Sequence, residues 1–374
     1  MSKQTSKKIC FIASHFPQGG AERQITELIK GLIERGYQIT LICYQSNVIF
    51  FREIKELNIE LILNNNKPSK STFIKWIKNV MFLRNALKKG SFDVLHTYLF
   101  FNGLILRLFA PYKYKNSIVY SIRNSYESAP KFFMFFDKLL NNKSVNIYNS
   151  KKSFREIYPN PTPNILKNNK VIYNGFNQDI FSNSKEQNNE IITLGMVGRI
   201  AKQKNHIQVL RVLNKMKCNL IKPLKIYLIG DSFDERENID NFIKANSLEK
   251  YIVLLDAQNN IEDYYSIFDI FVLSSLYEGC PNVLFEALLS KCLCVVSNGS
   301  NSDDFIKDNV NGLVYDGSDK MLELKLNEAL DPRNKNSMDN IAYNGYKYAK
   351  KNFATSTMIK NYVNIYKQIF VLDE

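Results

Sequence analysis

The chain alternates short apolar segments with amphipathic helical segments, and it does so in two successive sets. The first set opens with an apolar run at residues 7–14, a Gly19-Gly20 turn and a helical segment at 21–35. The second set opens with the apolar run at 191–198. This alternation is typical of parallel sheets that carry helices on both faces. We therefore expect an α/β protein with two Rossmann-like domains.

The same two patterns predict the individual elements. Apolar runs predict strands at 7–14, 37–44, 92–96, 117–122, 145–149, 171–176, 191–198, 224–230, 251–255, 270–275, 293–297 and 312–315. Helical periodicity predicts helices at 21–35, 71–89, 100–110, 205–217, 235–246, 261–268 and 281–290, and it fills most of 320–370. Ser150 is expected to cap a further short helix.

A polar segment sets the expected domain boundaries. The chain has 374 residues, which is too long for one ordinary core. Its composition becomes polar before the second set begins, which is typical of a linker. We predict an N-terminal domain at 1–176, a linker at 177–190, a C-terminal domain at 191–352, and a C-terminal helix at 353–374 that packs back on the N-terminal domain.

Positive charge is concentrated in the first half of the chain. Residues 1–174 contain 27 Lys+Arg and 10 Asp+Glu, whereas the remainder contains 23 and 26. This asymmetry predicts an anionic partner for the N-terminal domain. Two basic segments rich in apolar residues, 71–89 and 130–140, are candidates for peripheral contact with an anionic membrane, and burial of their apolar residues is the alternative. No run of about 18 apolar residues is present, so no transmembrane helix is expected.

Several classes of site are excluded by motifs that the sequence lacks. The six cysteines show no paired C-x-x-C sets, which favours reduced thiols in a reducing compartment and no structural zinc. The chain contains neither a G-x-G dinucleotide fingerprint nor a P-loop.

Two glutamates occur in a setting that suits a ligand. Glu278 follows an apolar strand, and Glu286 lies within the helix that Pro281 is expected to begin. The backbone N–H groups of Gly279 and Cys280 would lie at the positive end of this helix, which suits an anion or a group of hydroxyls. Ligands bind at the carboxyl ends of strands in open α/β sheets, so we favour a binding site over two solvated charges.

A second loop, after the first strand of the second set, carries Arg199 and Lys204. Arginine supplies a planar fork of donors and lysine a mobile charge, which together suit a diphosphate. Two cations in a loop are usually solvated, but here they are expected across from Glu278 in the same domain. The combination predicts a nucleotide-sugar site, with the diphosphate on the cations and the hydroxyls on the carboxylates.

The chain resembles family 4 glycosyltransferases of the GT-B fold, in which two Rossmann-like domains with parallel sheets face each other across a cleft. The resemblance covers nearly the whole chain. It depends on five motifs: Gly19-Gly20-Ala21-Glu22-Arg23, Ser121-Ile122-Arg123-Asn124, Val171-Ile172-Tyr173-Asn174-Gly175, Gly198-Arg199 through Lys204-Asn205, and Glu278 with Glu286, separated by seven residues.

The resemblance implies a role for each matching residue. Arg199 and Lys204 would bind the donor diphosphate and stabilise the leaving group. Glu286 would hold the ribose hydroxyls, and Glu278 would face the transferred sugar, so the expected catalytic residues are Glu278, Arg199 and Lys204. Further donor contacts are expected from Gly19, Gly20, Gly279, Cys280, Pro281, Asn282 and Val283.

The resemblance also implies a retaining reaction that needs no metal. The chain contains no Asp-x-Asp, and Arg199 with Lys204 can neutralise the charge that Mg²⁺ otherwise would. We expect no cofactor, and we expect a UDP- or GDP-linked sugar as the substrate.

The acceptor side departs from the family pattern. Many relatives carry a histidine after the strand expected at 117–122, whereas this chain carries Arg123 and Asn124. These two residues and His96, at the end of the preceding strand, are the acceptor-side candidates, although a lone histidine at a strand end is more often structural. The nearby Lys113 and Lys115 form a further basic cluster for a charged acceptor.

These expectations combine into a glycosyltransferase that moves a hexose or N-acetylhexosamine from a nucleoside-diphosphate sugar to a glycan acceptor. The acceptor is expected to be lipid-linked, in the synthesis of cell-surface polysaccharide such as capsule or lipopolysaccharide. The expected location is the cytoplasm, at the inner face of the cytoplasmic membrane. A sugar-nucleotide epimerase or a phosphorylase on the same fold is the alternative. A nucleic-acid-binding protein is a distant alternative, because no known nucleic-acid-binding pattern accompanies the basic residues.

Overall fold

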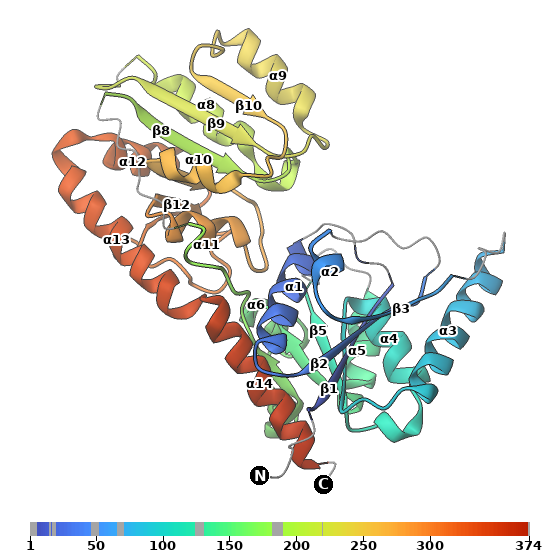
Figure 1. Ribbon diagram of the computed structural model, residues 1–374. Coiled ribbons are helices and arrows are strands. Elements are labelled where there is room, and N and C mark those ends of the chain that lie inside the picture. Colours follow the sequence, from blue (N-terminus) through green and yellow to red (C-terminus); the bar gives the residue numbers. More distant parts are fainter. Residues whose placement is uncertain are drawn as a thin grey trace. The chain divides into compact units, whose positions relative to one another are not determined.

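The chain folds into two compact units, each with a sheet flanked by helices (Figure 1). The computed structural model describes residues 6–14, 16, 20–45, 52–65, 71–123, 131–181, 190–218 and 220–372. Unit 1 comprises residues 1–175 and 355–374, and unit 2 comprises residues 176–354. The segment at 177–190 belongs to unit 2, where the structure describes 177–181 and 190.

Unit 1 contains a seven-stranded parallel sheet in the order β3-β2-β1-β4-β5-β6-β7. Its strands are β1 (Lys8–Ala13), β2 (Gln38–Cys43), β3 (Glu60–Leu63), β4 (Val94–Tyr98), β5 (Ile118–Ile122), β6 (Val145–Tyr148) and β7 (Asn169–Val171). The central strands β1, β4 and β5 are buried along most of their length because helices cover both faces of the sheet.

The helices of unit 1 come from both ends of the chain. They are α1 (Gly20–Ile33), α2 (Arg52–Glu56), α3 (Thr72–Lys89), α4 (Phe100–Phe109), the 3-10 turn η1 (Tyr112–Tyr114), α5 (Lys131–Leu139), η2 (Asn141–Lys143), α6 (Lys151–Ile157), α7 (Pro163–Asn168) and α14 (Thr355–Leu372). The last helix, α14, packs beside α1, and its Tyr362 and Tyr366 are fully buried in the core between α1 and the sheet. The final helix of the chain therefore completes the core of its first unit.

Unit 2 contains a six-stranded parallel sheet in the order β10-β9-β8-β11-β12-β13. Its strands are β8 (Ile192–Val197), β9 (Leu224–Ile229), β10 (Ile252–Leu255), β11 (Ile270–Leu273), β12 (Leu293–Ser297) and β13 (Leu313–Tyr315). Its helices are η3 (Lys202–Lys204), α8 (His206–Met216), α9 (Arg236–Ala245), α10 (Ile261–Ile267), α11 (Asn282–Leu289), α12 (Asp319–Leu330), η4 (Pro332–Asn334) and α13 (Lys335–Asn352).

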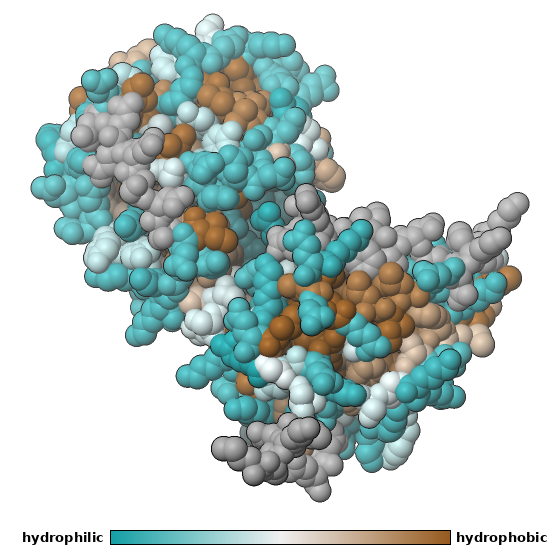
Figure 2. All heavy atoms as spheres, viewed as in Figure 1, coloured by the Kyte–Doolittle hydropathy of each residue, from teal (hydrophilic) through white to brown (hydrophobic). Residues whose placement is uncertain are grey.

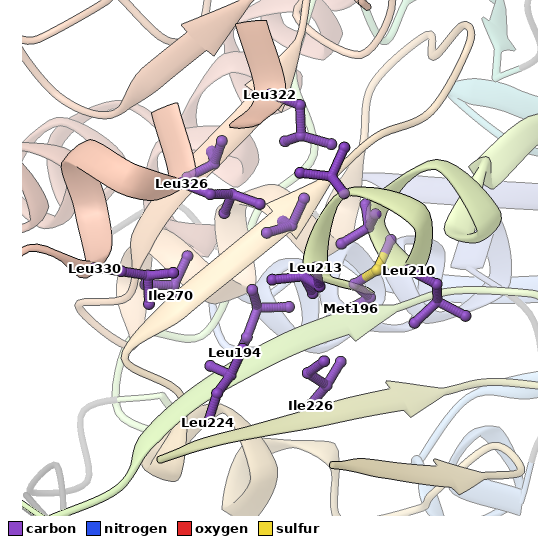
Figure 3. Close-up of a cluster of buried hydrophobic side chains, with 14 of the residues drawn as sticks. Leu194, Met196, Leu210, Leu213, Leu224, Ile226, Ile270, Leu322, Leu326 and Leu330 are labelled. Atoms are coloured by element: carbon purple, nitrogen blue, oxygen red, sulfur yellow. The ribbon is translucent and has the colours of Figure 1, made fainter. Parts of the chain in front are cut away.

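The core of unit 2 forms where α8 and α12 pack on one face of this sheet (Figure 3). Leu210 and Leu213 of α8 lie over Leu194 of β8, and Leu326 of α12 belongs to the same buried cluster. These packed layers hold the strands rigidly, so the loops at the strand ends start from defined positions.

The predicted strands and helices are largely confirmed, mostly with ends that differ by one or two residues. The exception is the strand and turn predicted at 171–176, because β7 already ends at Val171. Four of the α-helices and strands were not predicted: α2, β3, α5 and α7. β3 is an edge strand with a partly exposed, four-residue run, and α7 begins at a proline, which favours the first helical turn. The strand predicted at 92–96 is β4, which begins two residues later, so His96 lies in the middle of the strand and not at its end.

Candidate active site

The strand order of unit 2 places a switch point between β8 and β11. From β8 the chain continues to β9 and β10 on one side, and it then returns to β11 on the other side. A crevice forms outside the carboxyl ends of the strands at such a point, and ligands bind there. The loop after β8 carries Arg199 and Lys204, and the loop after β11 carries Glu278.

Lys204 and Glu278 form an ion pair at this switch point. The lysine Nζ donates to Oε1 of Glu278 at 2.6 Å, and the two side chains are 15% and 10% exposed. Gly198 makes room for the lysine, because a Cβ at that position would lie 3.0 Å from the lysine Cε. The structure thus brings together one predicted cation and one predicted carboxylate.

Hydrogen bonds tie the two loops to each other. The Oγ of Ser274 donates to the carbonyl oxygen of Lys204 at 2.8 Å. The amide of Leu276 donates to the carbonyl oxygen of Gln203 at 2.8 Å, and Nε2 of Gln203 donates to the carbonyl oxygen of Tyr277 at 2.9 Å. Neither Ser274 nor Gln203 could be predicted from the sequence, because each is only a polar residue in or beside a motif.

A third loop, after β12, supports the loop that carries Glu278. The amide of Glu278 donates to the carbonyl oxygen of Gly299 at 3.1 Å, and Oγ of Ser302 donates to that of Gly279 at 2.7 Å. A Cβ on Gly299 would lie 2.1 Å from the carbonyl oxygen of Leu276, so this approach requires glycine. Three adjacent strands therefore contribute loops to one site.

Glu286 is positioned by a tyrosine of the neighbouring helix α10. The Oη of Tyr265 donates to Oε2 of Glu286 at 2.9 Å. Burial raises the pKa of Tyr265 well above its usual value, and the charge of Glu286 raises it further. The phenol therefore stays protonated and keeps donating. Tyr265 was not predicted, because a buried tyrosine in a helix looks like any other core aromatic residue.

The helix after the Glu278 loop is α11, and it begins at Asn282, one residue later than predicted. Pro281 precedes the helix with an extended backbone and is buried. Gly279, Cys280, Asn282 and Val283 are half-buried around this helix start. Their contact with a donor remains a prediction.

Arg199 lies against an aromatic ring. Its Cζ is 5.5 Å from the ring centroid of Phe233, which is exposed on the loop after β9. Within the part of the chain that is described, the Arg199 side chain forms no hydrogen bond or ion pair. The structure therefore brings Lys204 into contact with a predicted carboxylate but does not do so for Arg199, whose role at the diphosphate remains a prediction.

His206, which was not predicted, lies beside the ion pair. It begins α8 and is buried. Burial lowers the pKa of His206 to about 4, and the positive charge of Lys204 contributes to the shift. The imidazole is therefore neutral at neutral pH and adds no charge to the site.

His96, an acceptor-side candidate in unit 1, is fully buried. Its Nδ1 lies 2.6 Å from Oη of Tyr366, and its Nε2 lies 2.9 Å from Oγ of Ser121. Burial holds the pKa of His96 well below its usual value, and the guanidinium of Arg123 lowers it further. Both ring nitrogens have partners, so the ring presents no nitrogen to an acceptor in this structure.

Arg123, a second candidate, lies half-buried at the carboxyl end of β5. Its guanidinium donates to Oδ1 of Asn174 and, at 3.0 Å, to Oη of Tyr362. Its Cζ lies 5.3 Å from the ring centroid of Tyr98. Because Tyr362 belongs to α14, the last helix of the chain positions this arginine.

The structure describes some of the remaining predicted residues of unit 1 but not others. Gly20 begins α1, whereas Gly19 and Asn124 lie outside the described residues. Lys113 and Lys115 are exposed, and their ammonium groups donate locally, to backbone carbonyl oxygens and to a tyrosine hydroxyl, respectively.

A cavity of about 1500 Å³ in unit 1 lies elsewhere, at the amino ends of β1, β2 and β3. We place the candidate site at the switch point of unit 2 instead, because charged groups converge there at the carboxyl ends of the strands. Among the described residues, no group of three or more His, Cys, Asp or Glu side chains could hold a metal ion. The described helices include none with the length and apolar character needed to cross a membrane.

Two protein families match the chain in sequence. Residues 18–179 match the model of Glycosyltransferase Family 4, and residues 177–348 match that of Glycosyl transferases group 1. The chain is 23% identical over 360 residues to an *Escherichia coli* UDP-Gal:alpha-D-GlcNAc-diphosphoundecaprenol alpha-1,3-galactosyltransferase, a match that covers 89% of this chain and 91% of that enzyme. It is 27% identical to the *Staphylococcus aureus* capsular polysaccharide biosynthesis glycosyltransferase CapH, with 80% and 85% covered.

Solved structures of glycosyltransferases share the fold. A glycosyltransferase from *Rickettsia africae* superimposes with a TM-score of 0.79 at 19% identity, over 98% of this chain and 99% of that one. *Anabaena* HepE in complex with UDP superimposes with a TM-score of 0.78 at 18% identity, over 96% and 100%.

The fold and the site define a glycosyltransferase of the GT-B class. The chain belongs to glycosyltransferase family 4 and is a hexosyltransferase. The predictions of fold class, family and enzyme class are thereby confirmed, in favour of transfer over the epimerase, phosphorylase and nucleic-acid-binding alternatives.

Proposed function

We propose that this enzyme transfers a hexose or N-acetylhexosamine from a nucleoside-diphosphate sugar to a lipid-linked glycan, in the synthesis of a cell-surface polysaccharide. The observation that carries the proposal is the Lys204–Glu278 ion pair, which lies at the switch point of unit 2 and close in sequence to the start of α11. The carboxylate holds the lysine ammonium at an edge where ligands bind, so a diphosphate that arrives there can bind the ammonium in competition with Glu278.

The relatives support the classes of donor and acceptor. The *Escherichia coli* enzyme is named for UDP-Gal and for an acceptor linked to diphosphoundecaprenol. A *Campylobacter jejuni* relative, 26% identical with 80% of this chain covered, is named for a diphospho-undecaprenol-linked acceptor. HepE has been solved with UDP and with UDP-glucose. We therefore infer UDP as the first choice of nucleotide and GDP as the second.

The reaction replaces one bond at the anomeric carbon with another. The acceptor hydroxyl oxygen bonds to that carbon, the bond from the carbon to the β-phosphate oxygen breaks, and the hydroxyl proton passes to the departing diphosphate. Negative charge grows on the leaving group, where Lys204 and Arg199 would supply positive charge. Glu286, oriented by Tyr265, would hold the ribose hydroxyls, and Glu278 would face the transferred sugar.

Retention of anomeric configuration and independence from metal ions belong to the same proposal. Retention is supported by the spacing of Glu278 and Glu286, which resembles that of the retaining family. Metal independence is supported by Lys204, whose ammonium can neutralise the leaving diphosphate. A lipid-linked acceptor also implies that the enzyme works at a membrane surface, and the basic first half of the chain supports peripheral contact at the cytoplasmic face.

A thermal-shift screen with UDP-, GDP- and ADP-sugars would identify the donor. The stabilising donor would then be incubated with a diphosphopolyprenyl-linked N-acetylhexosamine. We expect one nucleoside diphosphate released for each sugar transferred, no loss of rate in EDTA, and an unchanged anomeric configuration by NMR.

The variant Arg199→Ala/Lys204→Ala provides the test of the site. It should lose the thermal shift and the transfer together. Full donor affinity in this double variant would show that the site lies elsewhere, and a donor hydrolysed or isomerised without transfer would overturn the proposed reaction.

A further inference from the structure

The carboxyl ends of the neighbouring strands β8 and β9 approach each other closely in unit 2. Gly198 follows β8, and Gly230 follows β9. A Cβ on Gly230 would lie 2.1 Å from the carbonyl oxygen of Gly198, so this approach leaves no space for a side chain. The loop at 198–205 and the loop at 230–235 therefore start side by side.

Hydrogen bonds then hold these two loops together. The amide of Ile200 donates to the carbonyl oxygen of Asp231 at 2.9 Å, and the amide of Glu235 donates to the carbonyl oxygen of Ile200 at 3.3 Å. The amide of Lys202 donates to Oδ1 of Asp234 at 3.0 Å. These contacts attach the loop after β9 to the loop that carries the two predicted cations, so the backbone of both loops has a defined position.

The loop after β9 presents an aromatic ring to solvent. Of the phenylalanines that the structure describes in unit 2, only Phe233 is exposed, and it is 63% exposed. On the face of unit 2 shown in Figure 2, hydrophilic residues cover most of the surface. Packing in the core of unit 2 does not explain this ring, which lies at the carboxyl end of a strand, where ligands bind.

The ring lies beside the cation whose role the site leaves open. The Cζ of Arg199 is 5.5 Å from the ring centroid of Phe233, within the distance of about 6 Å at which a ring attracts a cation. Ordering a free arginine side chain when a ligand binds costs affinity, and a contact that orders it beforehand lowers this cost. A guanidinium has its N–H donors in its own plane, so a ring that attracts it from one side leaves donors available to a diphosphate.

We propose that Phe233 is a positioning residue of the donor site, and that its ring holds the guanidinium of Arg199 where a nucleoside diphosphate binds it. This inference rests on the proposed function, because it takes Arg199 as a ligand of the diphosphate. It adds the loop after β9 to a site whose other loops follow β8, β11 and β12, so that four strands adjacent in the sheet contribute to the site.

Fluorinated phenylalanines at position 233 test the proposal. Fluorine withdraws electron density from the face of a ring and hardly changes its shape, so it weakens attraction to a cation and leaves packing intact. The full-length chain would be made with one, two or three fluorine atoms on this ring, and its affinity for UDP, or for GDP if UDP gives no heat, would be measured by calorimetry. Phe233→Leu removes the ring, and Phe233→Trp replaces it with a ring that attracts cations more strongly.

A second exposed ring of unit 2 provides the matched control. Tyr343 on α13 is 52% exposed, and Nζ of Lys347 lies 4.9 Å from its ring centroid. Tyr343→Leu therefore removes a ring with a cation beside it from another element, and it should bind the nucleotide like the wild type. All these variants should melt at the wild-type temperature, because the replaced rings are exposed.

We expect the affinity for the nucleoside diphosphate to fall with each added fluorine and to be about two- to fivefold lower in Phe233→Leu than in the wild type. Phe233→Trp should bind at least as tightly as the wild type. In an Arg199→Ala background, Phe233→Leu should cause no further loss, because the ring acts through the arginine. In a Lys204→Ala background the loss should remain.

Equal affinity across the fluorinated series would overturn the proposal. So would a Phe233→Leu enzyme that binds the nucleotide as tightly as the wild type or more tightly, because the ring would then not help Arg199 to reach the diphosphate. An undiminished loss in the Arg199→Ala background would also overturn it, because the ring would then act on the ligand directly.

The wild type and Arg199→Ala separate this proposal from the proposed function. A wild type that binds no nucleoside diphosphate would contradict the proposed function, and this proposal with it. A wild type that binds the nucleotide and loses affinity in Arg199→Ala, but whose affinity does not depend on the ring at position 233, would contradict the positioning role alone.

Discussion

Replacing Glu278 with glutamine should tighten the binding of a nucleoside diphosphate and slow sugar transfer. In the structure, Nζ of Lys204 lies 2.6 Å from Oε1 of Glu278. A diphosphate that binds the same ammonium has to approach this carboxylate. Glutamine has nearly the same shape and keeps an acceptor oxygen for the lysine, but it removes the negative charge.

The geometry of the ion pair sets the size of the effect. Two oxygens that accept hydrogen bonds from one ammonium lie about 4.5 Å apart. Two unit charges at that separation repel by about 1 kcal/mol in water and by about 4 kcal/mol at an effective dielectric constant of 20. Because the side chains of Lys204 and Glu278 are 15% and 10% exposed, solvent screens part of this repulsion. We expect about 1–2 kcal/mol, which corresponds to an affinity about 5- to 30-fold higher.

Isothermal titration calorimetry with UDP, or with GDP if UDP gives no heat, measures this affinity. Single-turnover transfer measures the loss of chemistry, since Glu278 is expected to face the transferred sugar. A Glu278→Gln enzyme that binds the diphosphate more weakly than the wild type would refute the reasoning, because the carboxylate would then assist the diphosphate and not compete with it.

Three further substitutions test other parts of the structure. Tyr265→Phe should weaken UDP binding several-fold by calorimetry, because it removes the hydrogen bond that orients Glu286, and it should leave inorganic diphosphate binding unchanged; equal losses for both ligands would contradict this role. In the wild type, burial lowers the pKa of His206 from the usual 6.5 to about 4. As the pH falls from 6.5 to about 4, the unfolded state binds a proton that the folded state does not, and the free energy of unfolding decreases by about 3 kcal/mol. His206→Gln should therefore show a smaller loss of urea resistance than the wild type between about pH 7 and about pH 4.5, and identical losses would exclude the effect. Asp137→Ala should destabilise unit 1 by about 3–5 kcal/mol in urea unfolding, because it leaves a buried arginine without its counter-charge, and a change below about 1 kcal/mol would contradict this.

Both sheets could largely be predicted from the sequence because buried parallel strands appear as unbroken apolar runs. The run at 270–275 is an example, and it became β11. The edge strand β3 was missed because its short run is partly exposed and carries little pattern. The start of β4 was placed two residues early, which moved His96 to a strand end that the structure does not have.

The site was predictable only as far as backbone topology determines it. Lys204 and Glu278 follow strands that lie side by side in the sheet, so their loops had to approach each other. The direction of the Arg199 side chain depends on which neighbour it packs against, and no motif predicted Phe233 as that neighbour. Tyr265 reaches Glu286 through the packing of α10 on α11, which sequence spacing does not reveal.

The discontinuous make-up of unit 1 has a consequence for biosynthesis. Unit 2 is one uninterrupted stretch, 176–354, whereas unit 1 also needs α14, which is synthesised after the whole of unit 2. The N-terminal unit therefore matures after the C-terminal one, the reverse of the usual vectorial order. In a nascent or prematurely terminated chain that stops before residue 355, the apolar core residues that pack against Tyr362 and Tyr366 would be exposed to water.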